Sequence, residues 1–176
     1  MPLIAADRSM LLLIDYQQRL LPAIHDADSV LANARRLGEA ARLVKVPVLR
    51  TEQNPQGLGA TAESLAGYGS MVEKRSFGSC ATPAFLKAIG TERTLVVAGC
   101  ETHVCLLQTV LGLCALGRQV HVVADACGSR TPLNRQAALE RMRAHGADIV
   151  TTEMVLFEWL GSCDHAAFRS IIDLIR

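Results

Sequence analysis

Residues 94–99 read Thr-Leu-Val-Val-Ala-Gly, a short aliphatic run in which polar and apolar positions do not alternate. A continuous run of this length predicts a strand that is covered on both faces. Residues 10–15, Met-Leu-Leu-Leu-Ile-Asp, and residues 120–125, Val-His-Val-Val-Ala-Asp, repeat the pattern. Weaker runs at residues 48–51, 71–74 and 149–152 complete a set of six expected strands.

Segments with a helical repeat separate these runs. We expect helices at residues 29–44, 83–89, 102–116, 133–145 and 164–175. Ser29 is a plausible N-cap for the first of them, and Pro83 suits the first position of the second. Strand and helix alternate along the chain, which predicts an α/β fold with a parallel sheet and helices on both faces.

Length and composition restrict the class of protein. The chain has 176 residues, of which 50% are hydrophobic and 20% are charged, so we expect one globular domain over residues 1–176. A net charge of +1 from scattered residues offers no cationic surface to nucleic acid or an anionic membrane. Residues 104–116 are too short an apolar stretch to span a bilayer, and no signal peptide is visible. We expect a cytoplasmic protein with reduced thiols that binds a small molecule.

A long connection follows the second expected strand. Residues 52–69 contain Gly, Pro and Gln, which are typical of a connection rather than a strand. Connections of this length in a compact domain often form a lid or a binding loop, and we expect such a role here.

Chemically useful side chains stand where strands end, and parallel α/β sheets bind ligands at that edge. Asp15 ends the first expected strand, Lys74 ends the third, and Cys105 lies in the first turn of the helix after the fourth. A helix N-terminus and a nearby ammonium both lower the pKa of a thiol. A carboxylate can hold the lysine and accept the thiol proton, while free N–H groups can bind the oxygen that becomes negative during attack on a carbonyl. The three residues predict a cysteine nucleophile whose pKa is lowered.

Each of these residues also has a structural interpretation. Cys105 can be a core thiol, Asp15 can cap a turn, and Lys74 can be a solvated residue of an edge strand. Their joint placement at strand ends favours chemistry. His103 is a poor base for Cys105, because side chains two residues apart on a helix point to nearly opposite sides.

The remaining cysteines and the glycines add no second site. Cys80 and Cys114 fit structural positions, Cys100 ends a strand near the site, and Cys127 and Cys163 have no visible partner. No His, Cys or Asp cluster has metal-ligand spacing, and no phosphate-binding glycine motif is present. We therefore expect neither a metal nor a cofactor, and a flavin or nucleotide carrier is disfavoured.

Three motifs resemble those of the isochorismatase-like cysteine hydrolases. They are Asp-Tyr-Gln at residues 15–17, Lys74, and Gly-Cys-Glu-Thr-His-Val-Cys at residues 99–105, which is similar to the family pattern G-x-x-T-x-x-C. Thr109 and Asp-Ala-Cys at residues 125–127 also fit. The resemblance covers nearly the whole chain, and residues 51–59 are similar to the isochorismatase domain-containing subgroup.

The resemblance implies a three-layer α/β/α Rossmann-like fold with six parallel strands in the order 3-2-1-4-5-6. It implies Cys105 as the nucleophile, Asp15 as the general base and Lys74 as the cation that supports the thiolate. By position, a cis peptide bond joins Cys100 to Glu101, and the N–H groups of Glu101 and Cys105 form the oxyanion hole. Family members are commonly oligomeric, so a homo-oligomer is also implied, and the apolar helix expected over residues 104–116 and the region of Trp159 are the candidate interfaces.

Departures from individual family members narrow the expected function. Glu52 and Gln53 stand where nicotinamidases carry metal ligands, and Cys105 stands where isochorismatases that cleave a vinyl ether have glycine. The resemblance therefore implies a hydrolase of a small carbonyl compound, such as an amide, a ureide or a related acyl substrate, with a covalent thioester. The alternative is a binding or scaffold protein that has kept the site but turns over weakly.

Four residues are predicted to contact the substrate. Their placement at strand ends suggests Gln17, Gln53 and Phe77, and Thr102 is added from the nucleophile motif.

Overall fold

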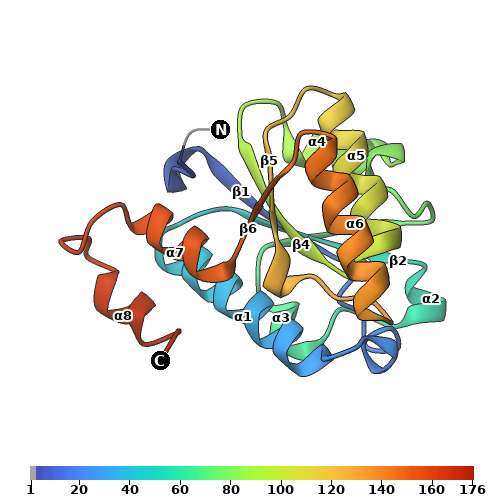
Figure 1. Ribbon diagram of the computed structural model, residues 1–176, viewed down its shortest axis with the longest axis horizontal. Coiled ribbons are helices and arrows are strands. Elements are labelled where there is room, and N and C mark those ends of the chain that lie inside the picture. The colour runs from blue at the N-terminus through green and yellow to red at the C-terminus, as the bar shows by residue number, and fades with distance from the viewer. Residues whose placement is uncertain (1–2) are drawn as a thin grey trace.

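The structure, a computed structural model that describes residues 3–176, is built around one six-stranded parallel sheet (Figure 1). The strands are β1 (Ser9–Ile14), β2 (Val48–Gln53), β3 (Ser70–Lys74), β4 (Thr94–Gly99), β5 (Val120–Val123) and β6 (Asp148–Val150). Their order across the sheet is β3-β2-β1-β4-β5-β6, and every neighbouring pair is parallel. The expected α/β fold and its strand order are confirmed.

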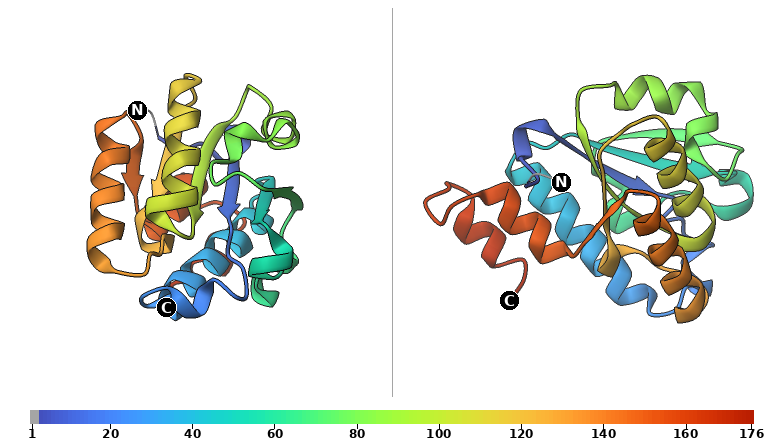
Figure 2. Two further views of the ribbon diagram at one scale, coloured as in Figure 1. Left: turned by 90° about the vertical axis from the view of Figure 1, so that its right-hand side faces the viewer. Right: turned by 45° about the horizontal axis from the view of Figure 1, so that its top comes forward.

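Helices cover both faces of this sheet. The main ones are α1 (Ala27–Leu43), α4 (Pro83–Ile89), α5 (Leu107–Ala115), α6 (Pro132–Ala144), α7 (Thr152–Leu160) and α8 (Phe168–Ile172). Helix α1 packs against α7 and α8, whereas α5 packs against α6. Figure 1 and Figure 2 show these two groups on opposite sides of the strands.

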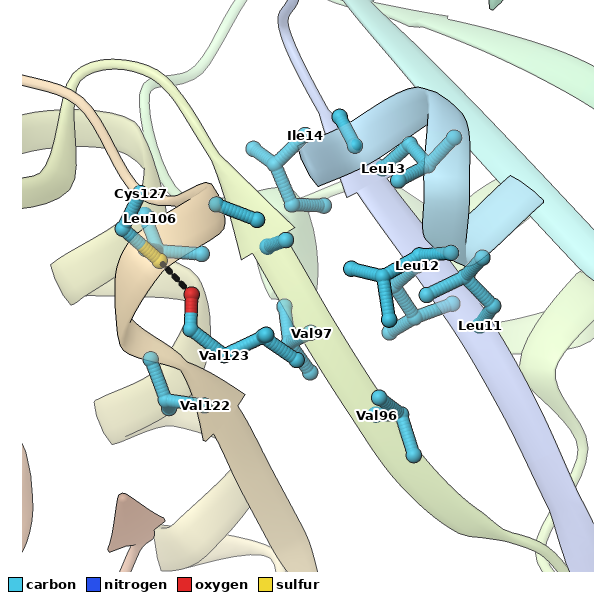
Figure 3. Packing of buried hydrophobic residues seen from close by; sticks show 14 of the residues in the cluster. Leu11, Leu12, Leu13, Ile14, Val96, Val97, Leu106, Val122, Val123 and Cys127 are labelled. Carbon is cyan, nitrogen blue, oxygen red and sulfur yellow. Dashed lines mark hydrogen bonds between the residues drawn. The ribbon is translucent and has the colours of Figure 1, made fainter. Parts of the chain in front are cut away.

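The central strands are buried on both faces, which explains why their sequences do not alternate. Leu12 and Leu13 of β1 point to opposite sides of the sheet, yet neither is more than 1% exposed (Figure 3). Val97 of β4 is likewise fully buried. In the same view the Cys127 thiol donates a hydrogen bond to the carbonyl oxygen of Val123 over 3.0 Å. Cys127 is therefore a core residue.

The first helix begins earlier than its sequence predicts. Helix α1 starts at Ala27 with Asp26 as the residue before it, so Ser29 is not the N-cap. Asp26 has a φ of 55°, a left-handed conformation that reverses the chain after the short turn Leu21–Ala23. This reversal starts the helix before the residue with the favourable capping side chain.

The helix expected over residues 102–116 is two elements. A π-helical segment, Thr102–Leu106, precedes α5. The Leu106 N–H donates to the Glu101 carbonyl oxygen five residues back, and the Thr102 N–H donates to Gly128 over 2.8 Å. Cys105 consequently lies in a π turn, a wider helical form that is frequent at functional sites, rather than in the first turn of an α-helix.

The C-terminal quarter differs most from expectation. The strand expected over residues 149–152 ends at Val150, because Thr151 caps a helix by accepting a hydrogen bond from the Met154 N–H. That helix, α7, was not predicted, and the helix expected over residues 164–175 is only the short α8. Trp159 of α7 is buried and donates to Ser9, whereas Met154 and Phe157 of the same helix are exposed.

The long connection contains two single-turn helices, α2 (Pro55–Leu58) and α3 (Glu63–Ala66). The buried carboxylate of Glu52 holds it, since one oxygen accepts from both the N–H and the hydroxyl of Thr61 at 2.7 Å. Within residues 3–176, no helix combines the length and the hydropathy needed to cross a bilayer.

Candidate active site

Asp15 and Lys74 form a buried ion pair at the carboxyl edge of the sheet. One Asp15 oxygen lies 2.6 Å from the Lys74 ammonium, and both side chains are fully shielded from solvent. The other oxygen accepts a hydrogen bond of 2.6 Å from the hydroxyl of Thr51. The strand ends β1, β2 and β3 therefore fix this carboxylate from two directions.

The ammonium of Lys74 has an acceptor for each of its three hydrogens. Besides Asp15, it donates to the carbonyl oxygens of Ser76 over 3.2 Å and Phe77 over 2.8 Å. A buried charge is tolerated only when it is paired and hydrogen-bonded in this way. Lys74 is thus a fixed cation, not the solvated edge residue of the structural interpretation.

Cys105 lies beside this ion pair, with only 6% of its surface exposed. Burial, and then the negative charge of Asp15, raise the pKa of the Cys105 thiol to about 12, against the opposing effect of Lys74. The expectation of a lowered pKa is therefore wrong for the free protein, because loss of hydration outweighs the nearby ammonium. The resting group is a neutral thiol next to a carboxylate.

The backbone before Cys105 is arranged around the peptide unit of Glu101. The N–H groups of Val104 and Leu106 both donate to the carbonyl oxygen of Glu101, and the Cys105 N–H between them does not. Within residues 3–176 the Glu101 N–H has no hydrogen-bond acceptor. The peptide bond between Cys100 and Glu101 is cis.

The two glutamines predicted to bind substrate, Gln17 and Gln53, form hydrogen bonds with neighbouring backbone groups. The amide oxygen of Gln17 accepts from the Gln53 N–H, and its nitrogen donates to Gly59 over 2.6 Å. The Gln53 side chain donates to the carbonyl oxygen of Arg75 over 3.0 Å. Both side chains tie the connection after β2 to its neighbours.

Phe77 and Thr102 are placed very differently from each other. The Phe77 ring is 54% exposed, while its carbonyl oxygen accepts from Lys74. Thr102 is fully buried, and its hydroxyl is the one buried side-chain oxygen or nitrogen in the described part of the chain without a partner.

Thr51 and Ser79 were not selected as site residues from the sequence, and Thr109 was named there only as fitting the family motif. The Thr109 hydroxyl donates to the Cys105 carbonyl oxygen over 2.7 Å and accepts from the Ser79 N–H over 3.0 Å, so it anchors the π turn. Thr51, which fixes Asp15, was visible as the polar residue that ends the expected strand at residues 48–51. Ser79 gave no signal, since it lies in a short turn far from any motif.

A cavity of about 490 Å³ opens beside Lys74, but neither Asp15 nor Cys105 is among the residues that line it. The end of β3, the start of α2 and the segment before α4 line it, including Gln56, Arg75, Ser76 and Thr82. Within residues 3–176, no three His, Cys, Asp or Glu side chains lie close enough together to hold a metal ion. His103 instead lies 3.0 Å from the hydroxyl of Ser129 through its Nδ1.

The chain is similar in sequence to a known protein family. The family model described as the isochorismatase domain matches residues 9–154. The mouse isochorismatase domain-containing protein 2A is 37% identical over 98% of this chain and 85% of its own length. The bovine isochorismatase domain-containing protein 2 is 39% identical over 96% of this chain and 83% of its own length.

Solved structures of similar proteins share the fold. A protein described as the MAR1 ribonuclease of Caenorhabditis elegans has a TM-score of 0.93 at 32% identity, over 99% of this chain and 92% of its own. YcaC of Pseudomonas aeruginosa, determined with covalent acrylamide, has a TM-score of 0.90 at 26% identity, over 98% and 91% of the two chains. YcaC of Escherichia coli, described as an octameric hydrolase of unknown specificity, has a TM-score of 0.91 at 24% identity, over 99% and 91%.

Proposed function

Because this chain belongs to the isochorismatase family, we propose that it is a cysteine-dependent hydrolase of a small carbonyl compound, such as an amide, a ureide or a related acyl substrate. The observation that carries the proposal is the buried Asp15–Lys74 ion pair beside the buried thiol of Cys105. These groups come from the ends of three different elements, and a purely structural thiol has no need of such neighbours.

The first half of the reaction transfers a proton and forms a covalent bond. Asp15 takes the thiol proton as Cys105 sulfur attacks the carbonyl carbon of the substrate. Once Asp15 is protonated, Lys74 is the counterion of the negative charge that moves to the sulfur and then to the carbonyl oxygen. The raised pKa of Cys105 keeps the thiol neutral until a carbonyl group is in place.

The second half releases both products. The tetrahedral oxyanion collapses, the bond to the leaving group breaks, and the leaving group takes the proton from Asp15. A water molecule then gives its proton to Asp15 and attacks the thioester. Collapse of that second intermediate frees the acid, and the proton on Asp15 returns to the sulfur of Cys105.

The oxyanion is proposed to bind to two backbone groups. Glu101 and Cys105 are assigned as its donors, because the Glu101 N–H has no acceptor within residues 3–176 and the Cys105 N–H does not share the carbonyl bonded by its neighbours. The mechanism requires no metal or cofactor.

The substrate-binding residues keep their predicted roles as part of the proposal. Phe77 is exposed and follows Ser76, which lines the cavity beside Lys74. Gln17 and Gln53 are assigned an indirect role, because their hydrogen bonds hold the connection after β2 in place. Thr102 is assigned to the π-helical segment that carries Cys105.

One observation favours the second candidate, a binding or scaffold protein. Burial of Cys105 and a pKa of about 12 keep the thiol neutral in the free state, which also suits a protein that binds its ligand without turnover. A net charge of +1 gives no reason to extend the ribonuclease description of the nematode protein to this chain.

A substrate screen separates the two candidates. Amides, ureides and esters are offered to the wild type, to Cys105→Ala, and to Cys163→Ala as a control that removes an exposed thiol. We expect turnover by the wild type and by Cys163→Ala, and a loss of at least about 10³-fold in Cys105→Ala. Binding without turnover supports the scaffold, and full turnover by Cys105→Ala contradicts the mechanism.

A further inference from the structure

The loop after β5 forms hydrogen bonds with residues 99–103, which precede Cys105. The Gly128 N–H donates to Gly99 over 3.2 Å, and its carbonyl oxygen accepts from the Thr102 N–H over 2.8 Å. The Ser129 hydroxyl lies 3.0 Å from Nδ1 of His103. Residues 128–130, called the clamp loop here, therefore contact the chain on both sides of the Cys100–Glu101 peptide.

Arg130, the third residue of the clamp loop, forms an ion pair with Glu101. Nε of Arg130 lies 2.9 Å from one oxygen of Glu101, and a second guanidinium nitrogen lies 3.4 Å from the other oxygen. The Glu101 side chain is 10% exposed, whereas that of Arg130 is 63% exposed. The carboxylate is thus the buried partner, and the guanidinium approaches it from the solvent side.

The carboxylate of Glu101 poses an electrostatic problem for the proposed chemistry. Its own backbone N–H is a proposed donor to the oxyanion, so a negative side chain stands close to where negative charge develops. The charge of Glu101 also contributes to the raised pKa of Cys105. An unpaired carboxylate at this position opposes both thiolate formation and the oxyanion.

We propose that Arg130 is a positioning residue for the oxyanion hole: it neutralises the Glu101 carboxylate and fixes that residue, so that the Glu101 N–H serves the substrate carbonyl. This inference rests on the proposed function. Arg130 acts through Glu101 and touches neither the thiol nor the substrate.

The clamp loop is closely packed at its first residue. A Cβ at Gly128 would lie 2.5 Å from a methyl carbon of Ile24 and 3.2 Å from the sulfur of Cys100, so this position has no room for a side chain. The two-point contact with Glu101 fixes the orientation of both side chains. The conservative variant Arg130→Lys keeps the charge and loses the two-point geometry.

The test compares two probes of the same sulfur. p-Nitrophenyl acetate is attacked at its carbonyl carbon, forms an oxyanion, and releases p-nitrophenolate as the acetyl thioester forms, with the thiol proton passing to Asp15. Iodoacetamide is attacked at its CH₂ carbon and loses iodide as the thiol proton passes to Asp15, so its reaction creates no oxyanion. Rates are measured at residue 105 by mass spectrometry of the peptide, because other thiols also react.

Arg130→Gln should slow acylation of Cys105 about tenfold and slow alkylation less. Arg130→Lys should recover most of the loss. In a Glu101→Gln background, where no carboxylate needs neutralising, Arg130→Gln should cost less than about twofold. The control is Arg93→Gln. Arg93 donates hydrogen bonds to the carbonyl oxygens of Asp7 and Ser9 at the opposite edge of the sheet.

The outcomes separate this inference from the proposed function. Equal losses from Arg130→Gln in both backgrounds, equal slowing of the two probes, or no loss at all would each overturn the role of Arg130. If the wild type forms no acetyl adduct at Cys105, the proposed function itself fails. Arg130→Gln leaves the mostly buried carboxylate of Glu101 unpaired and should lower stability, so urea unfolding must show that each variant is folded under the conditions of the rate measurements.

Discussion

Asp15 has a φ of 53°, an unusual conformation for a residue other than glycine. Aspartate tolerates it better than most residues, and the hydrogen bond from Thr51 and the ion pair with Lys74 hold the side chain there. The carboxylate that ends β1 is thus fixed by its own backbone and by two neighbouring strand ends.

Two buried threonines in the same region should respond oppositely to loss of their hydroxyls. Thr109 makes hydrogen bonds to Cys105 and Ser79, so Thr109→Val should lower the free energy of unfolding by about 1–3 kcal/mol. Thr102 has no partner within residues 3–176, so Thr102→Val should leave stability unchanged or raise it by up to about 1 kcal/mol. Urea unfolding measures both.

A loss of stability in Thr102→Val equal to that in Thr109→Val would contradict this assignment. It would mean that the Thr102 hydroxyl has a partner, such as a buried water molecule.

Part of the site could be predicted from single residues and part could not. Asp15, Lys74 and Cys105 were located by one rule, that strand ends of a parallel sheet share an edge, and the structure brings them together. The direction of the thiol pKa shift could not be predicted, because burial is the largest cause and only the packed fold determines it.

At the scale of elements, the strands were predictable and the C-terminal helices were not. Runs of aliphatic residues define buried strands through local sequence alone. Helix α7 begins where the carboxylate of Asp125 accepts from the Thr152 N–H, a contact between residues 27 positions apart. The sequence Thr-Thr at residues 151–152 has strand propensity, and this distant cap turns it into a helix start.

The turn before β3 requires glycine at one position. Gly69 has a φ of +62°, and a Cβ there would lie 1.9 Å from the carbonyl oxygen of Val48. Gly69→Ala should therefore lower the free energy of unfolding by more than about 3 kcal/mol and disturb the strand that ends in Lys74. Gly161 has a φ of +65° with nothing within 4 Å, so Gly161→Ala should cost only about 1 kcal/mol. If both variants lose the same free energy of unfolding, the backbone near Val48 must shift to accommodate the new Cβ, which contradicts this prediction.

At the scale of the molecule, buried thiols couple stability to pH. Burial raises the pKa of both Cys105 and Cys127 to about 12, above the unfolded value of about 8.5. Their contribution is complete below about pH 8.5 and is lost as the pH rises toward 12, because only the unfolded chain ionises them in this range. We expect the free energy of unfolding to fall by roughly 1 kcal/mol per pH unit for each such thiol.

Urea unfolding in the presence of a reductant, between about pH 8 and about pH 11, measures this loss. Cys127→Ala should show a shallower decline than the wild type, whereas Cys163→Ala, which removes an exposed thiol, should match it. A stability that is independent of pH in this range would contradict the assigned shifts.

Self-association of the whole molecule stays a prediction. The E. coli YcaC protein is described as octameric, and it shares the fold at 24% identity. Trp159 is buried, but Met154 and Phe157 of α7 are exposed, and Leu116 just beyond α5 is 57% exposed. Both candidate interfaces, the apolar helix and the Trp159 region, stay predictions.

The most direct measurement of the proposed mechanism identifies which sulfur carries an acyl group. Wild type and Asp15→Asn are exposed briefly to p-nitrophenyl acetate at neutral pH and analysed by peptide mass spectrometry. The mechanism predicts an acetyl thioester on Cys105 of the wild type and its near absence in a folded Asp15→Asn. An adduct confined to Cys163, or equal labelling of Cys105 in both proteins, would contradict it.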